Sequence, residues 1–182
     1  RTPTNPPNPT HSLLAKQATQ LRFAFRVRVV FTYFGQLCLV LAALSLVPLV
    51  MAVIFGDTPI GLRYGIVIGG LAASGFGLAR LRAPSRVQAN EGMVLVALMF
   101  FFTPLVMSYP MMGAGLDFMD AFFEAVSGVT TTGLSTKATL VGAPQTFLFA
   151  RAWMQWYGGL GVVVLSLALI MQPGLVAKGQ IG

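Results

Sequence analysis

Charged residues are scarce in this sequence: 9% of its 182 residues are charged and 55% are hydrophobic. A soluble globular domain has roughly 25% charged residues, so this composition excludes an ordinary soluble protein. The sequence has one cysteine, Cys38, which excludes an intrachain disulfide and is expected to be a small buried hydrophobic residue. The chain is therefore predicted to be a membrane protein surrounded by the lipid bilayer.

Familiar catalytic patterns are also lacking. No HExxH, GxSxG or phosphate-binding P-loop occurs, and the one histidine, His11, lies in a Pro-rich tail far from Ser127 and Ser135. We therefore expect no enzymatic activity and no organic cofactor. The net charge is +7, but the basic residues lie between long apolar segments, which favours a role in membrane orientation over nucleic-acid binding.

Four apolar segments are long enough to cross a hydrocarbon core about 30 Å thick. They cover residues 29–55, 60–79, 92–112 and 147–171. Ahead of them, residues 1–28 form a polar tail and then a basic amphipathic stretch, which we expect to lie as a helix on the membrane surface. Within the second segment a four-residue spacing predicts one helix face that a neighbouring helix approaches closely, formed by Gly61, Gly65 and Gly69.

Basic residues are concentrated on one side of these predicted spans. They occur before the first span, after the second (Arg80, Arg82 and Arg86) and after the fourth (Lys178). Because positively charged loops remain in the cytoplasm, both termini are expected to be cytoplasmic. The opposite side carries four carboxylates, those of Asp57, Asp117, Asp120 and Glu124.

A short amphipathic stretch, residues 116–127, lies between the third and fourth spans and precedes the TTTG segment, which is Thr130, Thr131, Thr132 and Gly133. Asp117 suits the start of a helix, and Gly128 suits its end. A helix of about 12 residues reaches only about halfway across a bilayer at 1.5 Å per residue. We therefore predict a re-entrant helix followed by an extended polar strand.

Successive carbonyl oxygens of such a strand can replace the water around a monovalent cation. The strand would begin at Val129 and continue through the TTTG segment, in which Gly133 permits unusual backbone angles. Three carboxylates, those of Asp117, Asp120 and Glu124, would attract cations to the outer mouth. The residues alone leave a second interpretation open, namely a polar re-entrant turn that binds no ion.

Two stretches, DAFFEAVSGVTTTGLST (residues 120–136) and RAWMQWYGGLGVVVLSLALI (residues 151–170), resemble the TrkH/TrkG/KtrB potassium-uptake family, as does Ser108-Tyr109-Pro110. The resemblance implies a pore made by four helix–pore loop–helix repeats in one chain. Its filter would be Val129 and the TTTG segment, with potassium bound by the backbone oxygens of Thr130, Thr131, Thr132 and Gly133. Two extra N-terminal spans favour the TrkH branch, since KtrB-like members lack them.

The same resemblance implies four parts: a cytoplasmic tail and interfacial helix (1–28), an N-terminal pair of spans (29–82), the first repeat (92–172) and the start of a cytoplasmic link (173–182). Because one TTTG segment cannot surround an ion, either four chains assemble or the chain is an N-terminal fragment of a longer protein, and we favour the fragment. The family implies potassium uptake across the inner membrane, a TrkA-like cytoplasmic nucleotide-binding subunit and a dimer of full-length chains. The alternative is a non-conducting truncated scaffold or subunit.

Residues of the last span carry two further expectations. Arg151 would pair with Glu124 or Asp120, because a charge near the start of a membrane helix needs a partner. The glycines of QWYGGLG (residues 155–161) are expected to pack against other helices, with Trp156 as an interfacial anchor. One departure from the family is Ala150, where an aromatic residue is usual.

Overall fold

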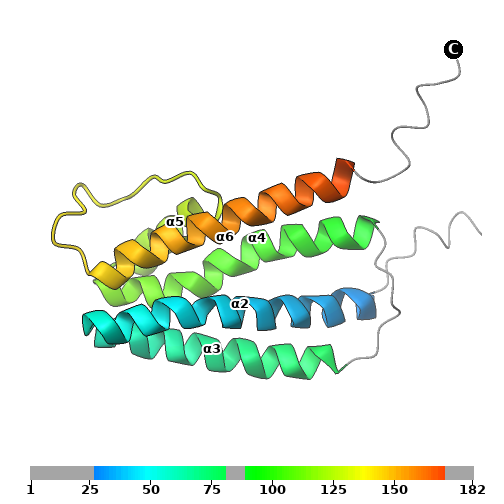
Figure 1. Ribbon diagram of the computed structural model, residues 1–182, viewed down its shortest axis with the longest axis horizontal. Coiled ribbons are helices and arrows are strands. Elements are labelled where there is room, and N and C mark those ends of the chain that lie inside the picture. The colour runs from blue at the N-terminus through cyan, green and yellow to red at the C-terminus, as the bar shows by residue number, and fades with distance from the viewer. Residues whose placement is uncertain (1–26, 81–88, 171–182) are drawn as a thin grey trace, which may run out of the picture.

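Four long helices lie side by side in the part of the protein that the computed structural model describes, residues 27–80 and 89–170 (Figure 1). They are α2 (Val27–Phe55), α3 (Thr58–Ala79), α4 (Ala89–Met111) and α6 (Gln145–Ile170). A 3-10 turn, η1 (Met112–Ala114), and a short helix, α5 (Phe118–Val129), connect α4 to α6. These described residues contain no strand. The predicted interfacial helix, the arginine-rich loop after residue 80 and the link after residue 172 lie outside them.

Three of these helices, α2, α3 and α4, are long and apolar enough to cross a membrane, counting the described residues alone. The prediction of an all-α, multi-pass membrane protein is thus confirmed, and the three helices match the first three predicted spans to within three residues at each end. Helix α6 extends over 26 residues beside α4 but is not among the three. Its part as a fourth span stays a prediction.

Helices α2 and α3 form an antiparallel hairpin that closes at Gly56, whose φ of +74° favours glycine. Their closest approach is at Gly35 and Gly75, since a Cβ on Gly35 would lie 2.6 Å from the Leu78 Cβ and one on Gly75 would lie 2.7 Å from Leu39. Within the described residues, the predicted packing face is covered at one of its three glycines. No atom of the described chain lies within 4 Å of a Cβ built on Gly65 or Gly69, although Gly61 does approach Ala52.

The reason is the position of the buried face of α3. That face consists of Ile60, Tyr64, Val67, Leu71 and Gly75. Each glycine of the predicted stripe follows such a position by one or two residues, and one residue rotates the direction of a side chain by about 100° around a helix. The four-residue spacing identified a face correctly but could not indicate what covers it.

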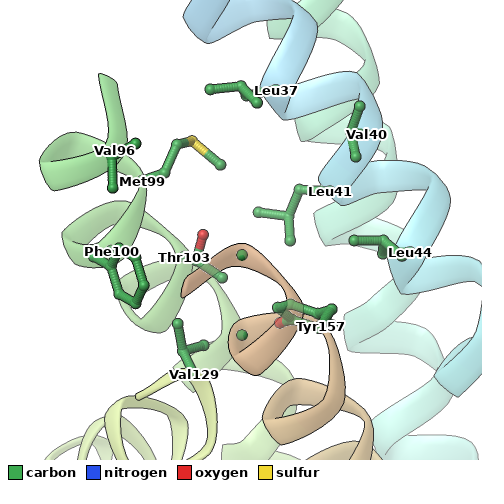
Figure 2. A pocket seen from close by; sticks show the side chains of 12 residues that line it. Leu37, Val40, Leu41, Leu44, Val96, Met99, Phe100, Thr103, Val129 and Tyr157 are labelled. Atoms are coloured by element: carbon green, nitrogen blue, oxygen red, sulfur yellow. The ribbon is translucent and has the colours of Figure 1, made fainter. Parts of the chain in front are cut away.

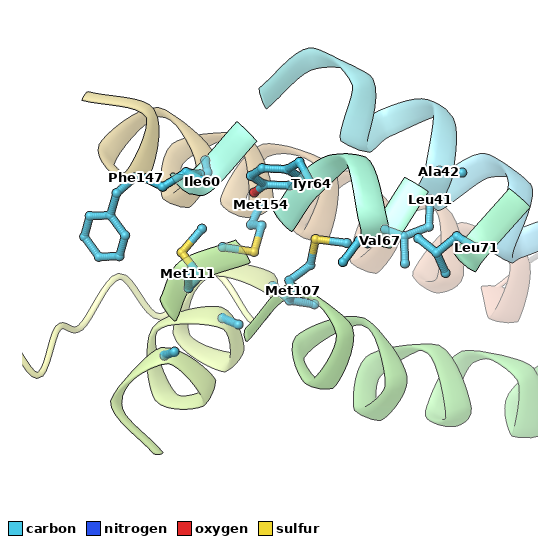
Figure 3. Close-up of a cluster of buried hydrophobic side chains, with 14 of the residues drawn as sticks. Leu41, Ala42, Ile60, Tyr64, Val67, Leu71, Met107, Met111, Phe147 and Met154 are labelled. Carbon is cyan, nitrogen blue, oxygen red and sulfur yellow. The ribbon is translucent and has the colours of Figure 1, made fainter. Parts of the chain in front are cut away.

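A buried hydrophobic cluster joins this hairpin to the helices that follow (Figure 3). Ile60 and Tyr64 of α3 meet Met107 and Met111 of α4 and Met154 of α6. Unbranched methionine side chains adapt to the irregular gaps between helices that cross at different angles. Cys38 is also in the cluster, with 0% of its surface exposed, so its expected role as a buried hydrophobic residue is confirmed.

Candidate functional site

Helix α5 begins and ends two residues later than the predicted 116–127. Asp117 caps it as expected, because its Oδ1 accepts a hydrogen bond from the Asp120 N–H at 2.8 Å. Gly128, however, does not end the helix, which continues through Val129. A Cβ on Gly128 would lie 3.1 Å from the Met154 Cβ, so this glycine instead lets α5 pack closely on α6.

The backbone of the TTTG segment is not the predicted extended strand. Val129 is still helical, and Thr130 and Thr131 form a turn. The sign of φ alternates, from −84° at Thr130 to +59° at Thr131, then to +79° at Gly133 after a Thr132 whose φ is not positive. A positive φ at a β-branched residue costs on the order of 1–2 kcal/mol, so the surrounding contacts must hold Thr131 in place.

All four N–H groups of the TTTG segment point back at the end of α5. Those of Thr130 and Thr131 donate to the carbonyls of Val126 (2.9 Å) and Gly128 (3.0 Å). Those of Thr132 and Gly133 donate to the carbonyl of Ser127, at 2.9 and 3.3 Å. The carbonyl oxygens of the segment accept no hydrogen bond from residues 27–80 and 89–170, and all four residues are exposed. The segment therefore presents acceptors while its donors are used internally.

A buried ion pair lies behind the segment. The Arg151 Nε of α6 is 2.6 Å from Glu124 Oε2 of α5, and the Glu124 side chain is 0% exposed. The expectation that Arg151 pairs with a carboxylate is confirmed for Glu124. The second carboxylate oxygen, Oε1, accepts hydrogen bonds from the Ser135 hydroxyl at 2.5 Å and the Thr136 N–H at 3.0 Å.

The chain that follows Gly133 is held by the same groups. The Leu134 carbonyl accepts from the Ser127 hydroxyl at 2.7 Å and from the Arg151 Nη2 at 2.8 Å. The TTTG segment is thus tied at its start by the end of α5 and just after its end by Ser127, Glu124 and Arg151. From the sequence alone, Ser127 and Ser135 are considered only as possible nucleophiles. No local sequence signal indicates that their hydroxyl groups donate the hydrogen bonds that hold this part of the chain.

The outer-mouth prediction was wrong for Glu124. Because Glu124 is buried and paired with Arg151, it contributes no free negative charge to an aqueous entrance. Asp117 and Asp120 lie at the start of α5, about 18 Å and about 14 Å along the helix from Val129 at 1.5 Å per residue. Gly113, four residues before Asp117, packs against Ile60 at the start of α3, so both carboxylates lie toward the α2–α3 turn.

Glycines of α6 allow this close packing. A Cβ on Gly158 would lie 2.9 Å from the carbonyl carbon of Val129 and closer still to its oxygen, and a Cβ on Gly159 would lie 3.4 Å from the Thr131 Cγ2. Gly133 faces Gln155, whose Nε2 is 3.6 Å from the position of a Cβ there. The expected packing of the glycine-rich stretch against another helix is confirmed at Gly158, while Gly159 faces the TTTG segment.

An apolar cavity of about 230 Å³ lies on the other side of Val129, between α2, α4 and α6 (Figure 2). Leu41, Thr103 and Tyr157 are among the residues that line it. Because an unpaired ion is very unfavourable against aliphatic side chains, this cavity is not a cation path. The polar face available to an ion is the exposed TTTG segment.

Sequence comparison places this site within a known family. The family described as TrkH, cation transport protein, matches residues 73–180, which include α4, α5, the TTTG segment and α6. The chain belongs to the TrkH family.

Three relatives illustrate how much of a TrkH protein this chain represents. The Trk system potassium uptake protein TrkH of Salmonella typhimurium is 36% identical over 49% of this chain, and the TrkH of Halomonas elongata is 28% identical over 82% of it. The Trk system potassium uptake protein TrkG of Escherichia coli is 29% identical over 50%. The chain spans only 19%, 32% and 19% of the length of these three relatives, in that order.

Proposed function

We propose that this chain supplies one quarter of a potassium-selective pore, with the carbonyl oxygens of the TTTG segment as ion ligands. The observation that carries this proposal is the separation of donors from acceptors in that segment. Its four N–H groups are bonded to the end of α5, while its four carbonyls receive no hydrogen bond from the described chain. A cation requires oxygen acceptors and is repelled by N–H donors, so this backbone suits a cation.

The alternation of φ supports the same ligand set. Thr131 and Gly133 have positive φ, whereas Thr130 and Thr132 do not, and in this conformation all four N–H groups reach the end of α5. The carbonyl oxygens are thereby left for other partners, although the segment is a turn and not a strand. Val129 is the helical start of the proposed filter. Its carbonyl oxygen faces Gly158, so we assign the ion ligands to Thr130, Thr131, Thr132 and Gly133.

The depth of the segment fits a re-entrant pore loop. Val129 abuts Gly158, which is near the middle of the 26-residue helix α6. If α6 is the fourth span, the TTTG segment lies near the middle of the bilayer, where unpaired carbonyls cost several kcal/mol each unless water or ions reach them. The carbonyl end of α5 also points to this place, and its partial negative charge favours a cation.

The relatives suggest the wider setting. Several are named as Trk system potassium uptake proteins, and on that basis we propose potassium uptake across the cell inner membrane, driven by about 2.3 kcal/mol per charge for each 100 mV of membrane potential. Three further repeats would complete the filter. The proposal includes cytoplasmic termini, a TrkA-like regulatory subunit and a dimer of full-length chains.

Replacement of Gly133 by serine tests the proposal. A serine at φ +79° is strained and would reorient the carbonyls beside it, so rubidium uptake by cells that produce the complete reading frame should fall, or its preference over sodium should be lost. Gly142→Ser is a matched control, because Gly142 has the same φ of +79°, is exposed and has no atom within 4 Å of a Cβ.

The two variants must be compared at equal amounts in the membrane. Equal and normal uptake by both would refute the assignment of Gly133 to the filter. If the wild-type protein itself takes up no rubidium, the non-conducting scaffold is the better description.

A further inference from the structure

We infer that the α2–α3 hairpin positions the TTTG segment through helix α6. Asp57 and Trp153 make the contacts that hold α6 against the hairpin. The expected effect on ion selectivity rests on the proposed function, whereas the contacts themselves are independent of it. Each joins parts of the chain that are distant in sequence, 89 residues apart for Asp57 with Thr146 and 109 residues apart for Trp153 with Leu44.

Asp57 lies in the turn between α2 and α3 and acts on the start of α6. Its Oδ2 accepts a hydrogen bond from the Thr146 N–H at 2.9 Å. The first N–H groups of a helix have no partner within that helix, and a carboxylate there also complements the positive end of the helix dipole. Asp57 therefore caps a helix that is not its own, which links the outer end of the hairpin to α6.

Trp153 makes the second contact between α6 and the hairpin, at a place where α2 lacks one of its backbone hydrogen bonds. Pro48 has no N–H group, so the carbonyl of Leu44, four residues earlier, lacks its normal helical hydrogen bond. The Trp153 Nε1–H donates to this carbonyl at 2.9 Å. In a membrane span, where water cannot take its place, a freed carbonyl needs such a donor from a neighbouring helix.

The two contacts hold the start and one side of α6, and another face holds the TTTG segment. Asp57 binds a backbone N–H at the start of the helix, and the Trp153 side chain reaches α2. Arg151 and Gly158 are seven residues apart, close to two full turns, and share a face that is about 200° from Trp153 in the case of Arg151. Arg151 binds Glu124 and the Leu134 carbonyl, and Gly158 abuts Val129.

Helix α6 thus connects the hairpin to the proposed filter and is held in one orientation between them. A rotation or shift that follows loss of a hairpin contact would move Arg151 and Gly158 together. We therefore identify Asp57 and Trp153 as positioning residues. Neither touches the TTTG segment, and both are expected to act on it through α6.

The decisive test pairs Trp153→Phe with Pro48→Ala in the complete reading frame. Trp153→Phe removes the N–H donor but keeps an aromatic ring, and it should lower the ratio of rubidium to sodium uptake by up to about fivefold, the factor reached if the whole free energy of one hydrogen bond is transmitted to the filter. Adding Pro48→Ala restores an N–H at residue 48, which can bond the Leu44 carbonyl within α2. The double variant should therefore recover most of the ratio.

Two further variants serve as controls. Trp156→Phe is a control for the aromatic stacking: Trp156 is 58% exposed, has no hydrogen bond within the described chain and stacks on Trp153 with ring centroids 4.9 Å apart. This variant keeps a ring beside Trp153 and leaves the Trp153 N–H in place, so it should leave the ratio unchanged. Asp57→Ala should lower the ratio, whereas Asp57→Asn keeps an oxygen acceptor for the Thr146 N–H and should largely preserve it.

Hydrogen exchange of the TTTG amides, measured by mass spectrometry on the purified proteins, gives a readout that needs no transport. Trp153→Phe should speed this exchange about fivefold, and the double variant should reverse it. A double variant that behaves like Trp153→Phe in both assays would overturn the inference, since packing and not the hydrogen bond would then be responsible. Absence of uptake by the wild-type protein would refute the proposed function, while the exchange result would still decide the positioning role.

Discussion

Replacing Gly158 by alanine adds one methyl group at the tightest contact between α6 and the end of α5. The new Cβ would lie 2.9 Å from the Val129 carbonyl carbon and closer to its oxygen, whereas ordinary contacts of a Cβ begin near 3.4 Å. The neighbouring atom is backbone at the last residue of α5, which cannot rotate away as the tip of a side chain can. The helices must therefore separate, and the TTTG segment must move with Val129.

The expected change in the free energy of unfolding follows from two opposed effects. Alanine favours a helix over glycine by about 1 kcal/mol, while overpacking a tight contact costs about 1–3 kcal/mol. Gly161→Ala is the matched control, because it lies on the same helix and no atom of the described chain lies within 4 Å of a Cβ there. The gain in helix propensity is the same for both, so the two variants should differ in stability by about the overpacking cost, 1–3 kcal/mol.

Thermal unfolding of the two purified proteins in detergent measures this difference. Rubidium uptake in cells that lack other potassium uptake measures its consequence, with membrane abundance as the reference. Gly158→Ala should be the less stable variant and should lose uptake or selectivity, while Gly161→Ala retains both. If Gly158→Ala matched the control in stability and uptake, close packing of Val129 on α6 would not be what holds the proposed filter.

Two other predictions concern charge and orientation. Glu124→Gln leaves Arg151 buried without a counter-charge and should cost about 3–5 kcal/mol in thermal unfolding, against at most about 1 kcal/mol for Asp120→Asn in the first turn of α5; equal losses would contradict the buried-pair interpretation. In a Cys38→Ser background, Val141→Cys in the 90% exposed loop before α6 should react with a membrane-impermeant maleimide added to intact cells; labelling only after lysis would place that loop in the cytoplasm.

Apolar length determined most of what could be predicted about the fold. The runs in α2, α3 and α4 are bounded by Gly56 and Asp57 or by polar loops, so their ends were predictable to within three residues. Periodicity also identified α5 and its cap, Asp117. A charge in an apolar segment needs a partner, which was sufficient to predict that Arg151 pairs with a carboxylate, although not which one.

Features that depend on partners from distant segments could not be predicted. Glu124 was both a candidate for the outer mouth and one of two candidate partners of Arg151, and only the folded chain shows that it is buried in the ion pair. Gly128 was assigned to a helix end when its function is contact with Met154. Pro48 implied an unpaired carbonyl at Leu44, but only the folded chain shows that Trp153 is the donor.

The carbonyl oxygens of the TTTG segment have no hydrogen-bond donor among the described residues, which has a direct energetic consequence. Its four carbonyls receive no hydrogen bond from the described residues, and each would cost several kcal/mol if it faced lipid or a dry protein contact. The segment is nevertheless held by four backbone hydrogen bonds, two bonds to the Leu134 carbonyl and a buried ion pair. These contacts keep oxygens that lack a donor among the described residues in one arrangement, and we expect water or cations to supply the missing partners. A fixed arrangement of oxygens is what the proposed cation site requires, and it favours that proposal over a polar turn that binds no ion.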